Sequence, residues 1–303
     1  MNRKPINYPL MSVSCLYEKC NDDAVMIIDV SMDKVIGKEP IIYDELVTIP
    51  NSHFLDINVD LVDTDSAGVH SFPSQSQVNK VINKLGISEY STLVLYDNQG
   101  IYSSPRAWWI FHTFGLSNVF ILDGGLPEWI KQGYPTSSEY LTIDTKNVES
   151  LVNVGSDVIS FMDSCFDARQ LVSKQEVLIN LTDKKFSVID VRATARFNGL
   201  VDEPRQGVRS GHIPDSINLP FANVLNGNTY KRPTELRHLF SSILPEDSKR
   251  VVFSCGSGIT ACIGLVALIS SGADTRLYDA ALYDGSWSEW GSDASLPIAK
   301  SKI

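Results

Sequence analysis

A single cysteine stands before a glycine-rich turn in the stretch VVFSCGSGITACIGLVALIS, residues 251–270. The apolar residues before Cys255 predict a strand, and those after the turn predict a helix. Gly256 and Gly258 allow the backbone to curl so that several N–H groups point to one centre, which favours a bound anion. Together with a helix N-terminus, such a turn lowers the pKa of a thiol and produces a reactive thiolate. The spacing alone fits equally a nucleophilic cysteine and a buried cysteine beside a tight turn.

A near-copy of this stretch occurs earlier in the chain, as TLVLYDNQGIYSSPRAWWIFHTFG, with Asp97 in the position of the cysteine. Three further pairs of segments repeat in the same order: VMIIDVS with SVIDVRA, NSHFLDINVDL weakly with GHIPDSINLPF, and ILDGGLPEWIKQGYP with LYDGSWSEWGSDASLP. Asp97 and Cys255 lie 158 positions apart, and the other pairs keep nearly the same offset. A period of this length indicates two tandem domains.

Within each copy, short β-branched strand segments alternate with helical stretches, which is typical of an α/β domain with a mainly parallel sheet. The expected fold is therefore two tandem α/β domains, each a mainly parallel sheet flanked by helices. The expected ranges are 9–139 for the first domain, 140–164 for a polar linker and 165–299 for the second domain.

The helices that must position the two turns are also readable. After Asp97, Ser104 is expected to cap a helix that has Pro105 in its first turn and stops at Gly115. After Cys255, residues 261–269 are apolar on nearly every face, which predicts a buried helix ended by Gly272. The segment CFDARQLVSKQ is expected to open the second domain as a helix.

The composition limits the class of protein. A hydrophobic content of 43% and a charged content of 20% are typical of a globular domain, and the formal charge of −10 argues against a nucleic-acid or anionic-membrane surface. No apolar segment reaches transmembrane length, and the N-terminus lacks the apolar core of a signal peptide. The five cysteines show neither a disulfide framework nor metal-site spacing. A reducing, cytoplasmic setting without a metal is therefore expected.

Three segments resemble those of a known family: GHIPDSINLPF, the loop CGSGITA and the closing ALYDGSWSEW. Over nearly its whole length the chain resembles the two-domain rhodanese-type sulfurtransferases, and among them most closely the 3-mercaptopyruvate sulfurtransferases. The resemblance implies two tandem rhodanese-like domains, of which only the second is catalytic. It also implies that Asp97 marks the silent domain, because an aspartate cannot carry a sulfane sulfur.

The loop and two arginines indicate the substrate that the resemblance implies. Thiosulfate-using members place basic residues in this loop, whereas Gly256, Ser257, Gly258, Ile259 and Thr260 are uncharged.

In the 3-mercaptopyruvate branch, two arginines before the GHIP motif hold the carboxylate and carbonyl of the substrate, and Arg196 and Arg205 match them. The planar fork of arginine suits a 2-oxo acid. Arg192, in contrast, is expected to form a structural ion pair.

A serine–histidine–aspartate group also belongs to the resemblance. Ser257 lies in the loop, and the first-domain segment DLVDTDSAGVHSFP supplies His70 with Asp60, or with Asp63 as the alternative.

Other chemistry-bearing residues are expected to be structural. His212 is expected to brace a turn, and Cys262 is expected to be a small buried apolar residue. Trp129, Trp287 and Trp290 are expected in the core or the cleft wall.

The mechanism that these residues imply begins with attack of the Cys255 thiolate on the sulfur of 3-mercaptopyruvate. Pyruvate leaves through its enolate, and a persulfide remains on Cys255 until a thiol acceptor such as thioredoxin or a small dithiol, or cyanide, removes the outer sulfur. No cofactor is expected. Three alternatives stay open: a thiosulfate:cyanide sulfurtransferase, a non-catalytic binding module with the same fold, and, least favoured, a cysteine phosphatase. A phosphatase needs an arginine six residues after the cysteine, where this chain has Ala261.

Overall fold

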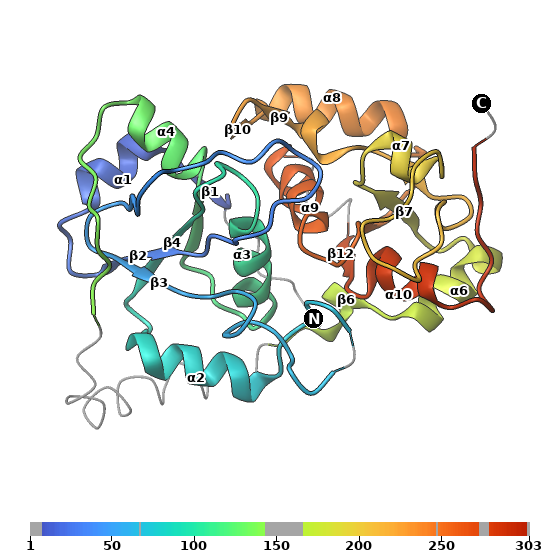
Figure 1. The fold of residues 1–303 in the computed structure, drawn as a ribbon, viewed down its shortest axis with the longest axis horizontal. Helices are drawn as coiled ribbons and strands as arrows, with labels where there is room; N and C mark the ends of the chain where they lie inside the picture. Colours follow the sequence, from blue (N-terminus) through green and yellow to red (C-terminus); the bar gives the residue numbers. More distant parts are fainter. Residues whose placement is uncertain (1–7, 67, 143–165, 247, 273–278, 302–303) are drawn as a thin grey trace.

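The computed structural model describes residues 8–66, 68–142, 166–246, 248–272 and 279–301. Two sheets, each made of parallel strands, lie side by side, with helices around them and between them (Figure 1). Most of the expected linker, 143–164, lies outside the described residues.

The first sheet has five strands in the order β1-β5-β4-β2-β3, and all its pairings are parallel. In chain order its strands are β1 (Leu10–Met11), β2 (Val25–Asp29), β3 (Ser52–Phe54), β4 (Thr92–Tyr96) and β5 (Val119–Leu122). Its helices are α1 (Val13–Lys19), α2 (Gln75–Leu85), α3 (Ser104–Thr113) and α4 (Gly125–Lys131).

The second sheet repeats this order position by position, as β6-β12-β11-β7-β8, again with parallel pairings. Its strands are β6 (Leu171–Val172), β7 (Ser187–Asp190), β8 (Ile217–Asn218), β11 (Arg250–Ser254) and β12 (Asp279–Tyr283). Its helical segments are η2 (Ala168–Gln170), α6 (Lys174–Asp183), α7 (Thr194–Phe197), η3 (Phe221–Val224), α8 (Pro233–Ile243), α9 (Ala261–Ser270) and α10 (Ser286–Ser292). A small antiparallel hairpin, β9 (Leu225–Asn226) and β10 (Thr229–Tyr230), precedes α8. The two-domain α/β prediction is confirmed.

The helix expected over residues 165–175 is wrong. Cys165 lies outside the described residues, and the segment after it forms η2 and the edge strand β6. The helix begins only at Lys174, because Ser173 and Glu176 form a reciprocal capping box. That serine–glutamate spacing is the signal that marks the true start.

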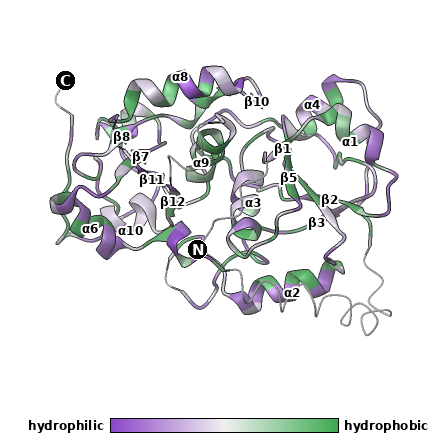
Figure 2. Ribbon diagram, turned by 180° about the vertical axis from the view of Figure 1, so that it is seen from behind, coloured by the Kyte–Doolittle hydropathy of each residue, from purple (hydrophilic) through white to green (hydrophobic). Residues whose placement is uncertain are grey.

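Helices pack on the sheets as their sequences demand. In α2 the buried residues are Val78, Val81, Ile82 and Leu85, which lie on one face at helical spacing. Figure 2 shows the corresponding hydrophobic and hydrophilic stripes along this helix. All residues of α9 are buried, as its uniformly apolar sequence predicts. Cys262 lies on this helix, and its burial raises the pKa of the thiol to about 12.

One apolar cluster spans both halves, and each half also has a cluster of its own. Helices α3 and α9 pack against each other, and a single apolar cluster includes Leu95 of the first sheet and Phe253 of the second. Trp129, Trp287 and Trp290 are buried as well, which confirms that they belong to the core.

Loops cross between the halves in a pseudo-symmetric manner. The segment after β3 reaches the second sheet, where the backbone N–H of Phe72 donates to Asp284 Oδ2 at 2.7 Å. The segment after β8 reaches the first sheet, where the N–H of Tyr230 donates to Asp123 Oδ1 at 2.9 Å. Asp123 and Asp284 occupy equivalent positions after the strands β5 and β12. Each half therefore receives a loop from the other at the carboxyl end of its sheet.

Candidate active site

Cys255 lies at the carboxyl end of β11, in the turn before α9, and its side chain lines a cavity of about 400 Å³. Cys255 is only 1% exposed, so its thiol is reached through this cavity. Gly258 has a left-handed φ of +85°, and its N–H donates to Cys255 Sγ at 3.1 Å. From the other side, the hydroxyl of Ser286 accepts the N–H of Cys255 at 3.1 Å. One backbone N–H of the turn, that of Gly258, therefore bonds the sulfur, whereas the two glycines predicted several converging N–H groups.

The remaining loop residues divide by the side of the turn on which they lie. Gly256, Ser257, Ile259 and Thr260 line the cavity together with Cys255. A Cβ atom at Gly256 would lie 3.2 Å from Arg196 Nη2, which explains the absence of a side chain there. Gly258 faces the opposite side, where a Cβ would come within 2.8 Å of the Asp284 carbonyl oxygen.

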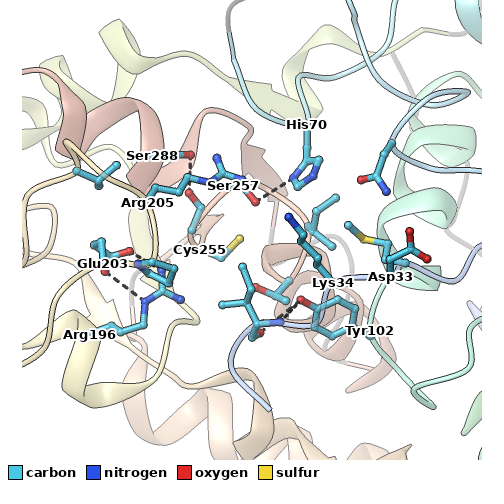
Figure 3. Close-up of a pocket in the computed structure, with 18 residues that line it drawn as sticks. Asp33, Lys34, His70, Tyr102, Arg196, Glu203, Arg205, Cys255, Ser257 and Ser288 are labelled. Carbon is cyan, nitrogen blue, oxygen red and sulfur yellow. Dashed lines mark hydrogen bonds and ion pairs between the residues drawn. The ribbon is translucent and has the colours of Figure 1, made fainter. Parts of the chain in front are cut away.

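Arg196 and Arg205 both line the cavity, but their hydrogen bonding differs (Figure 3). The guanidinium of Arg196 pairs with Glu203 through Nη2 and, at 3.3 Å, through Nε. Arg205 Nη1 is buried and has no hydrogen-bond partner within the described part of the chain. Burial, and after it the neighbouring Arg196, lower the pKa of Arg205, while Cys255 acts in the opposite direction. A buried donor without a partner is costly, so this atom is prepared for an acceptor from a ligand.

Arg192 forms the structural ion pair expected of it. Its guanidinium is 1% exposed and bonds to Asp190 at 2.6 Å and to Glu203 at 2.8 Å. It also stacks on Trp287, with 4.5 Å between its Cζ atom and the ring centroid. Because Glu203 also binds Arg196, this buried pair fixes one wall of the cavity.

His70 reaches the cysteine loop from the first half. Its Nδ1 lies 3.0 Å from Ser257 Oγ, so the structure brings together the histidine and serine named from the sequence. Burial first, then the cations of Arg205 and Arg106, lower the pKa of His70 to about 4. His70 is therefore neutral near pH 7, with one ring nitrogen able to accept a proton.

The structure does not join His70 to Asp60 or to Asp63 by a hydrogen bond among the residues that it describes. Asp60 accepts from Lys84 Nζ at 3.1 Å, and Asp63 accepts the N–H of Asp65 within its own turn. The lysine is contributed by α2, which no local pattern in the loop indicates.

Asn58 lies two positions before Asp60 and lines the cavity instead. The carboxylate that acts on His70 is Asp284, which raises the pKa of the histidine against the stronger opposing effects.

Several further cavity residues were missed in the sequence. Asp33, Lys34 and Tyr102 come from the first half and face the cysteine across the cavity (Figure 3). The Tyr102 hydroxyl is held by the N–H of Ile36 at 2.7 Å. They lie in the loops that follow β2 and β4, and functional residues are common in such loops, but no residue spacing singles them out.

Asp97 occupies, in the first half, the place that Cys255 has in the second. Its Oδ2 accepts the N–H groups of Tyr102, Ser103 and Ser104 at 2.9, 3.1 and 3.0 Å and the Ser104 hydroxyl at 2.7 Å. The expected Ser104 cap is therefore wrong, since Asp97 itself satisfies the first amides of α3. The Asp97 carboxylate therefore occupies the position at which the N–H groups of this turn would otherwise bind an anion.

His212 braces a turn, as expected. Its Nδ1 lies 2.7 Å from the carbonyl oxygen of Phe197, and its ring stacks on that of Phe197 with 3.8 Å between centroids. Its backbone also pairs with Ala299.

The described residues contain no group of three or more metal-binding side chains arranged for an ion. Within the same part of the chain, no helix has the length and hydropathy needed to cross a bilayer.

Comparisons with known proteins agree with this arrangement. The family model described as "Rhodanese-like domain" matches residues 12–132 and 173–293. The chain is similar to the 3-mercaptopyruvate sulfurtransferase of Homo sapiens, with 36% identity over 246 residues, which cover 80% of this chain and 76% of that protein. It is similar to the thiosulfate sulfurtransferase of Cricetulus griseus, with 36% identity over 247 residues and the same coverage of both chains.

Among solved structures, the chain is similar to SseA from Escherichia coli, described as a 3-mercaptopyruvate sulfotransferase with the rhodanese fold. The TM-score is 0.72 and the identity 28%, over 93% of this chain and 100% of that one. Two matched domains, the repeated sheet order and the cysteine turn agree, and the chain belongs to the rhodanese family.

Proposed function

We propose that this chain is a 3-mercaptopyruvate sulfurtransferase that carries the transferred sulfur on Cys255. The observation that carries the proposal is the composition of the cavity. It is lined by Cys255, by Arg196 and Arg205, and by the uncharged residues of the cysteine loop. The free donor of Arg205 suits a carboxylate or a 2-oxo group, because a guanidinium binds such oxygens with charge-assisted hydrogen bonds.

In the first half-reaction the Cys255 thiolate attacks the sulfur of the donor. A sulfur–sulfur bond forms, the carbon–sulfur bond breaks, and its electron pair leaves on carbon as the enolate of pyruvate, which then takes up a proton. The arginines stabilise the developing negative charge. The neutral ring of His70, bonded to Ser257, provides a route for the proton between the donor thiol and the leaving carbon.

In the second half-reaction a thiol acceptor, such as thioredoxin or a small dithiol, attacks the outer sulfur and restores the Cys255 thiolate. Cyanide serves in the same role and leaves as thiocyanate. This is a ping-pong scheme, and it needs no metal or organic cofactor. We place it in the cytoplasm, where the free thiols of Cys255 and Cys262 stay reduced.

Within this proposal, the first half is catalytically silent. Asp97 fills the cradle that would have to hold a sulfur anion, while the first half lends His70 to the second.

A second candidate function is thiosulfate sulfurtransfer. The exposed Lys34 lines the cavity opposite the two arginines, and a third cation suits a dianionic donor. The discriminating measurement is kcat/KM for 3-mercaptopyruvate and for thiosulfate with one common acceptor. A clear preference for thiosulfate would overturn the main proposal.

The persulfide itself is tested by intact-mass spectrometry after donor treatment. The wild-type chain is expected to gain one sulfur atom, and Cys255→Ser is expected to gain none and to lose all turnover. The matched control is Cys262→Ser, which leaves the buried cysteine of α9 without its thiol but keeps Cys255. A non-catalytic binding module would gain no sulfur in any form.

A further inference from the structure

A partly buried ion pair joins the two halves beside the cysteine turn. Arg106 lies in α3 and Asp284 follows β12, and Arg106 Nη1 donates to Asp284 Oδ1 at 2.7 Å. The side chain of Arg106 is 1% exposed and that of Asp284 is 19% exposed. Removing such charges from water is costly, and a pair of this kind contributes little net stability. The role of the pair must therefore lie in the segments that it holds in place.

On one side the pair holds the loop that carries His70. Arg106 Nη2 donates to the carbonyl oxygen of His70 at 2.8 Å, and the N–H of Phe72 donates to Asp284 Oδ2 at 2.7 Å. His70 has a left-handed φ of +57°, which a residue with a side chain rarely adopts. Such a conformation persists only where the surroundings enforce it. The two charges hold the backbone at the carbonyl of His70 and, two residues later, at the N–H of Phe72.

On the other side the pair lies against the cysteine turn. A Cβ at Gly258 would lie 3.3 Å from Asp284 Oδ1 and 3.4 Å from Arg106 Nη1. The N–H of this same glycine bonds Cys255 Sγ. The ion pair therefore touches both the loop that brings His70 and the turn that holds the nucleophile.

We propose that Arg106 and Asp284 are positioning residues that hold His70 against Ser257 beside the cysteine turn. They act through the backbone of residues 70–72, and neither side chain lines the cavity. This role rests on the proposed function, in which the His70–Ser257 pair handles a proton.

The internal repeat supplies a matched control. Asp123 is the counterpart of Asp284, and it accepts the N–H of Tyr230 at 2.9 Å on the silent side of the interface. Asp123→Asn thus alters an equivalent contact between the halves without touching the site.

The direct test is an NMR titration of the His70 ring in the wild type, Asp284→Asn, Arg106→Lys and Asp123→Asn. The His70 signal is assigned by its loss in His70→Ala. Loss of the Asp284 charge alone would lower the pKa of His70 below its value of about 4, because that carboxylate raises it. Release of the loop into water would instead raise the pKa toward 6.5.

We expect a rise in Asp284→Asn and in Arg106→Lys, because lysine lacks the planar fork whose two nitrogens bond Asp284 and the His70 carbonyl separately. No change is expected in Asp123→Asn. An unchanged or lower pKa in both site variants would overturn the proposal.

Turnover of 3-mercaptopyruvate gives the second test. Asp284→Asn is expected to lower kcat about tenfold, since a small misplacement of a proton-handling group costs up to about 100-fold, and Asp123→Asn should stay within about twofold. In a His70→Ala background, Asp284→Asn should cause almost no further loss, because both changes disable one unit.

Equal losses with and without His70 would overturn the route through the histidine. A His70→Ala enzyme with wild-type kcat would refute the proton route of the proposed function, while the titration still decides whether the pair positions the ring.

Discussion

At the scale of single residues, the arginines in and beside the cavity differ in whether a carboxylate of the chain already binds them. Arg196 is neutralised by Glu203, and Arg192 is buried between Asp190 and the same glutamate. Arg205 keeps a buried Nη1 that has no hydrogen-bond partner among the residues the structure describes. A substrate carboxylate would satisfy that donor, so Arg205 should contribute more to substrate binding than its exposed counterparts elsewhere on the chain.

We predict that Arg205→Lys lowers kcat/KM for 3-mercaptopyruvate about 10- to 100-fold, mainly through KM. Lysine keeps the charge but loses the fork, and a hydrogen bond to a charged group contributes about 1.5–3 kcal/mol. Steady-state kinetics would measure the change. Arg232→Lys is the control, because the Arg232 side chain is 81% exposed at the N-cap of α8 and its replacement should have no effect. Equal KM values for Arg205→Lys and wild type would contradict the assignment.

At the scale of elements, the strand–turn–helix unit appears twice, with a different side chain bound by the turn in each copy. After β4 the cradle holds the carboxylate of Asp97, and after β11 it holds the thiol of Cys255. The same local geometry is thus kept for stability in one copy and opened to a cavity in the other. The difference lies in the residue at the turn and in the loop that crosses from the opposite half.

We predict that Gly258→Ala lowers kcat at least about tenfold and the free energy of unfolding by about 1–3 kcal/mol. Alanine is strained at a φ of +85°, and its Cβ would press on the Asp284 carbonyl oxygen. Urea unfolding and kinetics would measure both effects.

The control for this variant is Gly133→Ala, which has a similar φ of +75° and no atom within 4 Å of the new Cβ. It should lose about 1 kcal/mol of stability from backbone strain and no activity. Similar kinetics for the two variants would show that the crowding at Gly258 is unimportant.

The elements were predictable from the sequence to the extent that they repeat or are locally patterned. Four pairs of repeated segments predicted two equivalent domains, whose sheets have the same strand order, and the cysteine turn is legible from its glycines. Contacts between distant segments were not predictable. Asp60 was assigned to His70 from the family resemblance, whereas Asp60 forms an ion pair with Lys84 on α2. Asp284 lies more than 200 positions from the loop that it holds, so no local spacing reveals it.

At the scale of the whole molecule, the interface between the halves contains the carboxyl of Asp123, whose charged form is disfavoured by burial. Burial raises the pKa of Asp123 to about 6, while its bond from the Tyr230 N–H acts in the opposite direction. A raised pKa in the folded state means that stability present at low pH is lost as the pH rises through about 6. Near pH 8 the folded protein therefore holds an unfavourable buried charge at this interface.

We predict that Asp123→Asn raises the free energy of unfolding at pH 8 by about 1–2 kcal/mol. Asparagine keeps an acceptor for the Tyr230 N–H and removes the charge. The gain should fade as the pH falls from about 6 to 3.8, where the aspartate is protonated in both states. Urea unfolding at several pH values would measure it. A gain of equal size at pH 4 and pH 8 would show that the charge is not the cause.

The exchange of loops has a consequence for the history of the chain. With a single copy of the repeat, each unit would lack the segment that completes its turn, unless an identical neighbour supplied it across a two-fold axis. The present arrangement has the form of such a pair joined end to end, with one of its two equivalent centres closed by a carboxylate. The closed centre still shapes the open one, because Asp97 bonds the N–H of Tyr102 and Tyr102 lines the cavity.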